Sequence, residues 1–203
     1  IRQTPSTRLP LKKCLTAKKQ LNLPGGGGIT SAAAVVGRGD RMIFYDFEVF
    51  KEDWLAVFID ATRKEEHVIV NDPDKLKALY EANRKDIWVG YNNRHYDQYI
   101  MKGILLGMNP KQINDWIIVE KKEGWQFSSA FNKIPMINYD VMPNPPVGLK
   151  TLEGFLGSDI KETDVDFRIN RKLTEKEIEM TIFYCRHDVE ETINVFLAKI
   201  DVF

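Results

Sequence analysis

The pattern of hydrophobic and polar residues changes near Met42. Residues 1–41 are mostly polar and basic, with four consecutive glycines and a run of small residues, and no periodic apolar pattern. From Met42 onward, apolar runs are separated by short polar turns. These runs predict three successive strands at 42–49, 54–62 and 67–71. Because the turns between them are short, we expect the three strands to pair antiparallel.

The middle of the chain alternates between helical and strand patterns. Asp72 followed by Pro73 is a helix-start signal, an N-cap followed by proline at the first helical position. The predicted helices cover 74–83, about 97–106, 110–120 and 149–156. The predicted strands cover 87–90 and 135–141. Strands that come first, followed by interleaved helices and strands, indicate an α/β fold with a mixed sheet.

The last predicted helix has the clearest pattern in the chain. Thr174 to Glu177 forms a capping box. Apolar residues then recur at steps of three and four, at Ile178, Ile182, Cys185, Val189, Ile193, Phe196 and Ile200. Tyr184 and Asp188 are one helical turn apart and lie beside this stripe. We therefore expect both side chains at the margin of a buried helix face.

Charge is distributed unevenly along the 203 residues. The totals balance, with 29 Lys and Arg against 29 Asp and Glu, but residues 1–41 hold eight basic residues and one acid. Residues 42–203 therefore carry 21 basic and 28 acidic residues, a formal charge of −7. Such a domain cannot hold nucleic acid by general basicity alone. An anionic substrate would need divalent cations and local Lys or Arg.

The composition predicts two parts and a reducing environment. Residues 1–41 are expected to be a flexible basic leader or linker, native or not, and residues 42–203 a folded domain. Because the chain begins with Ile1, we expect a fragment or a processed product. Two cysteines make no disulfide framework, and no apolar run is long enough to span a membrane, so we expect a soluble, cytoplasmic protein.

Two carboxylates interrupt the first strand. Strand side chains repeat every two residues, so Asp46 and Glu48 should project from the same face. Like charges held close together repel, and a bound cation or a shared proton relieves the repulsion. Asp97, at a helix start, and Asp188 offer two more acids. Hard oxygen ligands without a Cys or His cluster suit Mg²⁺ or Mn²⁺, and two such ions about 4 Å apart suit hydrolysis of a phosphodiester.

Three segments carry a resemblance to a known family. Asp46-Phe47-Glu48, the run from Gly90 to Asp97, and Tyr184-Cys185-Arg186-His187-Asp188 resemble the three exonuclease motifs of the DEDD superfamily of 3′–5′ exonucleases. Tyrosine four residues before the last aspartate resembles the subgroup that uses Tyr at this place. The second motif, together with Leu149 to Gly157, resembles the proofreading domains of DNA polymerases, phage-encoded ones above all. The resemblance covers residues 42–203 in the family's motif order.

The resemblance implies a ribonuclease-H-like fold and a 3′–5′ exonuclease acting on single-stranded or frayed DNA. It further implies that the protein is the proofreading module of a longer polymerase, in the host cytoplasm if phage-encoded. Asp46 would bridge two Mg²⁺ or Mn²⁺ ions, with Glu48 and Asp188 completing the tighter site and Asp97 holding the second ion, partly through water. Tyr184 would orient the attacking water. The implied nucleotide contacts are Phe47, Tyr91 and either of Asn92 and Asn93.

The same residues also fit other functions. An RNA-processing 3′–5′ exoribonuclease would use the same chemistry, because discrimination rests on the ribose 2′-hydroxyl. A catalytically silent domain that binds nucleic acid is a third possibility, although four mutually repelling carboxylates argue against it. Asp140, at the end of a predicted strand, is interpreted as a turn cap toward Pro143, with a supporting role near the site as the alternative.

Overall fold

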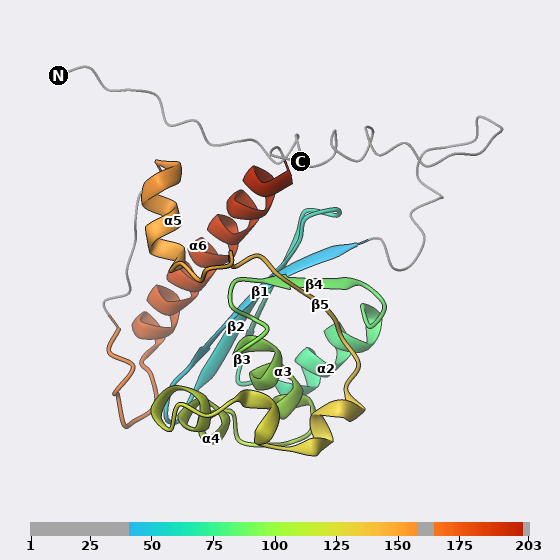
Figure 1. The fold of residues 1–203 in the computed structure, drawn as a ribbon. Helices are drawn as coiled ribbons and strands as arrows, with labels where there is room; N and C mark the ends of the chain where they lie inside the picture. The colour runs from blue at the N-terminus through green and yellow to red at the C-terminus, as the bar shows by residue number, and fades with distance from the viewer. Residues whose placement is uncertain (1–40, 158–164, 201–203) are drawn as a thin grey trace.

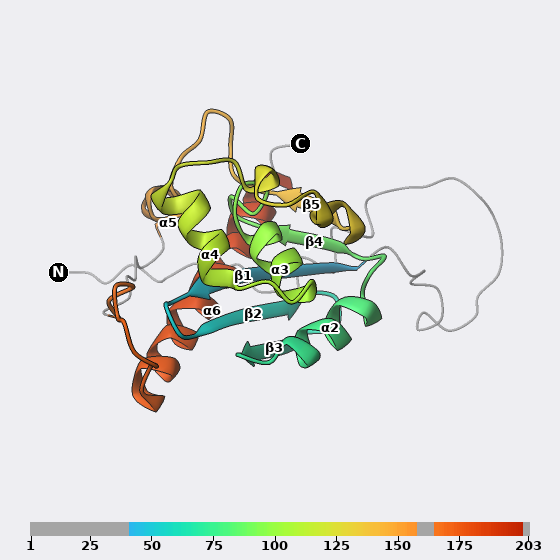
Figure 2. The ribbon, with the colours of Figure 1, turned by 90° about the horizontal axis from the view of Figure 1, so that it is seen from below.

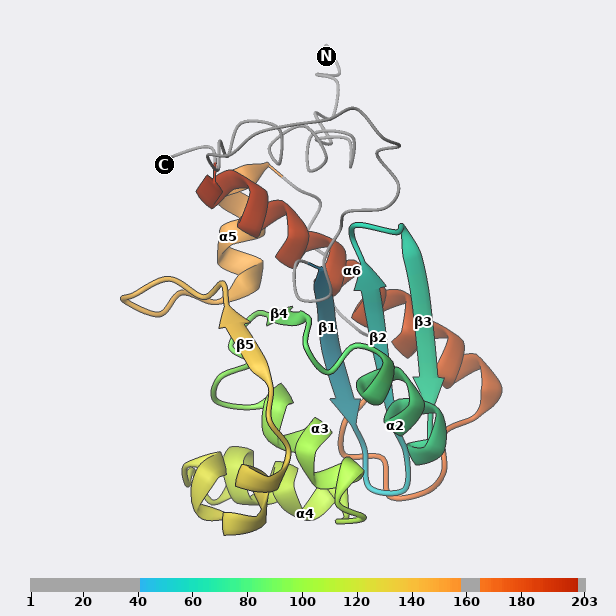
Figure 3. The same cartoon turned by 90° about the vertical axis from the view of Figure 1, so that its right-hand side faces the viewer.

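The protein is a mixed five-stranded sheet with helices on both faces. A computed structural model describes residues 41–157 and 165–200. The strands are β1 (Met42–Val49), β2 (Trp54–Asp60), β3 (Glu65–Val70), β4 (Ile87–Gly90) and β5 (Ile137–Asp140). Their order in the sheet is β3-β2-β1-β4-β5 (Figure 3). β1, β2 and β3 pair antiparallel, whereas β1, β4 and β5 pair parallel, which confirms the predicted mixed sheet.

The helices cover the two faces of the sheet unequally. They are α2 (Pro73–Ala82), α3 (Asp97–Leu105), α4 (Pro110–Asn114), α5 (Leu149–Leu156) and α6 (Glu175–Ile200). A π-helical turn, η1 (Asp115–Val119), and two 3₁₀ turns, η2 (Gly124–Gln126) and η3 (Ser129–Lys133), follow α4. α2, α3 and α4 lie on one face of the sheet, and α6 crosses the other with α5 beside it (Figures 1 and 2).

The alternation of side chains along β1 divides the core in two. Tyr45 and Phe47 point into an aromatic cluster under α2, α3 and α4, where the Tyr45 ring stacks on Phe58 with centroids 6.1 Å apart. Phe44 points to the opposite face and packs against Val189 and other residues of α6. β1 is therefore buried from both sides, as a strand in the middle of a sheet should be.

The predicted helix starts are confirmed in detail. The Asp72 side chain accepts a hydrogen bond from the backbone N–H of Lys75 at 2.8 Å. At the start of α6, Thr174 Oγ1 accepts from the N–H of Glu177 at 3.3 Å, and Glu177 Oε2 accepts from the N–H of Thr174 at 2.7 Å. This reciprocal pair is the capping box that the sequence predicts.

Several predicted boundaries were wrong. β2 ends at Asp60 because the Asp60 carboxylate accepts the N–H groups of Thr62 and Arg63 and turns the chain. β3 begins at Glu65, two residues early, and β5 covers only 137–140. The helix predicted for 110–120 changes from α to π geometry at Asp115. η2 and η3 were not predicted.

The domain boundary also shifts by one residue. Arg41, assigned to the leader from sequence, is buried and forms an ion pair with Asp86 at 3.0 Å, so it belongs to the fold. The predictions for residues 1–40, and the parts of the predicted 42–203 domain at 158–164 and 201–203, lie outside the described residues. Among the helices that the structure describes, none has both the length and the apolar character needed to cross a membrane.

Candidate functional site

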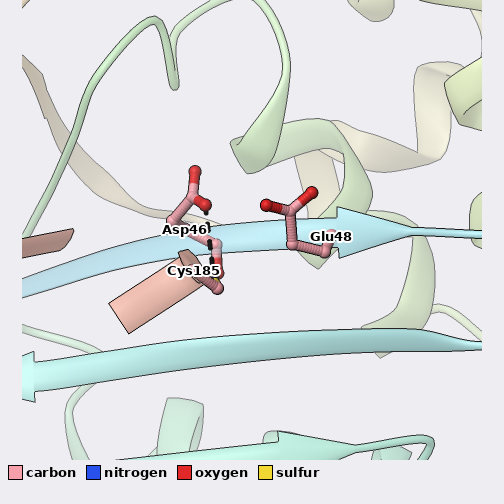
Figure 4. A group of neighbouring side chains, drawn as sticks. All are labelled: Asp46, Glu48 and Cys185. Atoms are coloured by element: carbon pink, nitrogen blue, oxygen red, sulfur yellow. Dashed lines mark hydrogen bonds between the residues drawn. The ribbon is translucent and has the colours of Figure 1, made fainter. Parts of the chain in front are cut away.

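Two carboxylates and a thiol meet where β1 passes under α6. Asp46 and Glu48 project from the same face of β1, as the alternation predicts (Figure 4). One oxygen of each carboxylate and Cys185 Sγ all lie within 4.8 Å of one another. The thiol of Cys185 lies 3.5 Å from both the backbone oxygen and the Oδ2 of Asp46. The sequence placed Cys185 in the core stripe of α6 but did not predict its contact with Asp46.

Asp97 reaches this site from the side of β1 that faces β4. It is the first residue of α3 and is 3% exposed. Its Oδ1 accepts a hydrogen bond from the backbone N–H of Phe47 at 3.2 Å. The pairing of β1 with β4 ends at Phe44, so this N–H has no strand neighbour on the β4 side. Asp97 takes the place that a strand partner would otherwise fill.

The loop that leads to Asp97 is held by Asp140. The Asp140 carboxylate accepts the backbone N–H groups of Asn92 at 2.9 Å, Arg94 at 3.1 Å and Met142 at 2.9 Å. Both interpretations of Asp140 therefore have support, since it caps the turn after β5 and also supports the loop before α3. The left-handed backbone of Asn92, with φ of 59°, fits this tight turn.

Asp188 approaches from α6 and is paired with a lysine. Lys150 Nζ, on α5, donates to Asp188 Oδ1 at 2.5 Å. The Asp188 side chain is 26% exposed, so it faces the margin of the site rather than the core. Sequence reasoning missed Lys150. A lysine in the first turn of a short helix looks like an ordinary surface residue, and only the packing of α5 on α6 reveals its partner.

Burial raises the pKa of all four acids, and the charges of the other site acids add to the shift at Asp46 and Glu48. Burial raises the pKa of Asp46 well above its usual value, followed by the charges of Asp97, Glu48 and Asp188. The pKa of Glu48 rises to about 8, through burial and then Asp188 and Asp97, against the opposing charge of Lys150. Asp46 and Glu48 nevertheless keep part of their surface exposed. The site therefore holds more carboxylates than cations to balance them.

The pKa values of the other two acids, Asp97 and Asp188, are also raised. Burial raises the pKa of Asp97 to about 7, although the hydrogen bond from the N–H of Phe47 opposes the shift. Burial also raises the pKa of Asp188, with Lys150 opposing. The structure thus brings together the four predicted acids from β1, α3 and α6, with Asp97 and Asp188 outside the tight group of Asp46, Glu48 and Cys185 but within electrostatic reach of it.

Tyr184 lies on α6 one turn before Asp188 and is partly exposed. Its ring packs edge-on against Phe183, with centroids 5.4 Å apart. The side chain is thus at the margin of the buried helix face, where the sequence placed it. Its hydroxyl can both donate and accept hydrogen bonds.

The predicted nucleotide contacts are corrected in part. The Phe47 ring is 3% exposed and packs in the aromatic cluster on the face opposite Asp46, so it offers no surface for a base. Asn93 is fully buried, and its amide donates to Asn138 Oδ1 at 3.0 Å and to the backbone oxygen of Tyr139 at 3.1 Å. Asn92 is partly exposed, which leaves it as the accessible asparagine of the two.

Two tyrosines flank this loop. The hydroxyl of Tyr91 donates to the backbone oxygen of Val147, and burial and then Asp140 raise its pKa to about 12. Tyr96, which the sequence did not single out, donates to Asn114 Oδ1 at 2.7 Å. Burial raises the pKa of Tyr96, and Asp97, Glu48 and Asp46 raise it further. Tyr96 therefore borders the acidic site, and its position directly before Asp97 was the only clue in the sequence.

The donor set fits hard divalent cations. Asp46, Glu48, Asp97 and Asp188 supply carboxylate oxygens, the ligands that Mg²⁺ and Mn²⁺ prefer. Burial raises the pKa of Glu48 and of Asp97, and a group of acids perturbed in this way is typical of a functional site.

Fold and site together define an α/β protein with an acidic cluster at the middle of a mixed sheet. No protein-family model, no curated protein and no solved structure matches the chain.

Proposed function

We propose that this protein is a metal-dependent 3′–5′ exonuclease that hydrolyses the terminal phosphodiester of single-stranded or frayed DNA. One observation carries the proposal. Asp46, Glu48, Asp97 and Asp188 converge from three elements in the motif order of the DEDD exonucleases, with Tyr184 one turn before the last acid.

The sheet supports a ribonuclease-H-like assignment. Three antiparallel strands followed by two parallel strands, in the order β3-β2-β1-β4-β5, are compatible with that layout. The acids lie on the central strand and on helices from both faces. In this placement the repelling carboxylates lie close together, and bound cations would offset their repulsion.

The four acids would hold two divalent cations, Mg²⁺ or Mn²⁺. Such ions, when bound, stabilise the attacking and leaving oxygens in phosphodiester hydrolysis. The protein's part is to hold the carboxylates in place. Phe47 fixes Asp97 through its N–H, and Lys150 holds Asp188 at 2.5 Å.

The remaining residues would bind and orient the substrate. The hydroxyl of Tyr184 would orient the attacking water toward the phosphorus, since a hydroxyl can accept from water while it donates to a phosphate oxygen. Asn92, partly exposed in the loop before Asp97, and Tyr96, partly exposed and within electrostatic reach of Asp46 and Glu48, would contact the last nucleotide by hydrogen bonding and stacking. Because the motifs resemble those of proofreading domains, we propose a DNA polymerase, of the phage-encoded type, as the functional partner.

A labelled single-stranded oligonucleotide tests the activity. With a 5′ label and Mg²⁺ or Mn²⁺, we expect a ladder that shortens one nucleotide at a time from the 3′ end, while circular single-stranded DNA stays intact. Asp46→Ala should abolish the ladder. Glu190→Gln is the matched control, because Glu190 is an exposed acid on α6.

The same assay separates the competing functions. Faster shortening of a matched RNA strand would favour the exoribonuclease. Shortening that survives Asp46→Ala would sink the proposal. Failure to degrade either strand, combined with no binding of Mn²⁺ by calorimetry in the presence of a nucleotide, would indicate a catalytically silent domain.

A further inference from the structure

Helix α5 buries an acid near its middle and exposes two large apolar residues, Phe155 and Leu156, at its end. Glu153 is 0% exposed and is the buried residue of this helix, whereas Phe155 is 80% exposed. A buried carboxylate is costly unless it is paired, and removing its partner leaves an uncompensated charge. Glu153 is therefore expected to have a charged or hydrogen-bonding partner close by.

Glu153 lies between two residues that border Asp188. Its Oε1 accepts from Lys150 Nζ at 3.2 Å, and the same Nζ donates to Asp188 Oδ1 at 2.5 Å. Its Oε2 lies 3.9 Å from His187 Nε2. Within residues 41–157 and 165–200, neither of these last two atoms has a hydrogen-bond partner. Lys150 is thus shared by two carboxylates, one of them at the candidate metal site and the other behind it.

The sharing matters when Asp188 takes up a cation. A cation and the Lys150 ammonium would then compete for the same carboxylate, and like charges close together repel. With Glu153 behind it, the ammonium has a second acceptor of opposite charge and does not depend on Asp188 alone. Without Glu153, the whole interaction of Lys150 would fall on Asp188.

We propose that Glu153 is a positioning residue of the metal site, which draws the ammonium of Lys150 away from Asp188 so that Asp188 can bind a divalent cation. This inference rests on the proposed function. It differs from a purely structural role, in which Glu153 only fastens α5 to α6. A structural role would change stability but not the affinity for metal.

Calorimetric titration with Mn²⁺ tests the proposal without requiring nuclease activity. Glu153→Gln keeps the shape of the side chain and removes its charge. We expect the Kd for Mn²⁺ to rise about three- to tenfold, the size of coupling common in a shared polar network. In the nuclease assay, kcat at low Mn²⁺ should fall while KM for the oligonucleotide stays constant.

A double-mutant cycle tests whether Glu153 changes the Kd for Mn²⁺ through Lys150. In a Lys150→Gln background, Glu153→Gln should leave the Kd for Mn²⁺ unchanged, because no ammonium competes for Asp188. The double variant also avoids a buried unpaired charge. Glu153→Asp, which keeps the charge on a shorter side chain, should fall between wild type and Glu153→Gln.

Three outcomes would overturn the inference. One is an unchanged Kd in Glu153→Gln with a lowered Tm, and another is an equal rise in Kd in both backgrounds. If Glu153→Gln does not fold, as seen by circular dichroism, an unchanged Kd in Glu153→Asp decides against it. Failure of the proposed function is separate, since wild type would then bind Mn²⁺ without degrading DNA. A wild type that binds no Mn²⁺ would refute both.

Discussion

The carboxylate of Asp97 accepts a hydrogen bond from the backbone N–H of Phe47, with 3.2 Å between Oδ1 and N. Phe47 lies on β1 between the two acids of that strand. Asp46 and Glu48 stand on either side of Phe47 in sequence, so a single backbone N–H fixes the third acid relative to the first two. The site therefore depends on the strand itself and not only on side-chain ion pairs. Variants that remove one acid should leave the frame of the others in place.

Asp46→Asn should separate activity from stability. The change removes a carboxylate that three other acids repel. We therefore expect the free energy of unfolding of the metal-free protein to rise by about 1 kcal/mol at pH 8. Exonuclease activity should fall at least about 100-fold, because cation binding contributes several kcal/mol to such reactions. Urea unfolding in the presence of a chelator and the ladder assay measure the two effects.

The control for this variant is Glu190→Gln on the exposed side of α6. It should leave both quantities nearly unchanged. A loss of stability in metal-free Asp46→Asn would contradict the picture of an over-charged site.

Stability of the metal-free protein should fall as pH rises from about 5 to about 8.5. The pKa values of Glu48 and Asp97, about 8 and about 7, lie above those of the unfolded chain. The folded state then binds more protons than the unfolded state, so the free energy of unfolding decreases as pH rises through these values. We expect Tm in chelator to drop by several degrees over this range.

Adding Mn²⁺ should reduce or reverse this drop, because the cations would replace the lost protons. Thermal unfolding with and without Mn²⁺ at each pH provides the measurement. A Tm that does not change with pH, either with or without Mn²⁺, would show that the acids do not repel one another.

Tyr184→Phe should lower kcat about 10- to 100-fold, with little change in KM. The ring stays in place against Phe183, and only the hydroxyl that would orient the water is lost. Single-turnover kinetics on an oligonucleotide measures the effect. Phe183→Leu, next to it and partly exposed, is the comparison: if it has the larger effect on kcat, packing and not the hydroxyl matters at this place.

Asp140→Ala should destabilise the protein by about 1.5–3 kcal/mol, because its carboxylate accepts three backbone N–H groups. The loop before Asp97 loses its support, so we also expect kcat to fall about tenfold. Urea unfolding and the ladder assay measure both. Asp74→Ala, an exposed acid at the start of α2, is the control, and an equal loss of stability there would argue against a special role for Asp140.

The sequence predicted the fold and the acids well where local patterns decide the outcome. The alternation in β1 and the capping box at Thr174 are local features, and both are confirmed. The four acids could be chosen as candidates because their residue types and order are visible along the chain, and the structure places them within electrostatic reach of one another.

The missed features depend on contacts between distant segments. The family resemblance assigned Phe47 to the nucleotide contacts, but the strand turns its ring to the opposite face. Lys150 and Glu153 acquire a role only when α5 packs on α6. The change to π geometry at Asp115 left no clear mark in the residue pattern.

The two faces of β1 constrain the length of this segment more than its composition. Tyr45 and Phe47 point into the aromatic cluster on one face of the sheet, whereas Asp46 and Glu48 point to the acidic site on the other. Inserting or deleting one residue before Asp46 would exchange the two sets and drive both carboxylates into an aromatic interior. A change of a single residue in the length of the strand would therefore disrupt the fold and the site together.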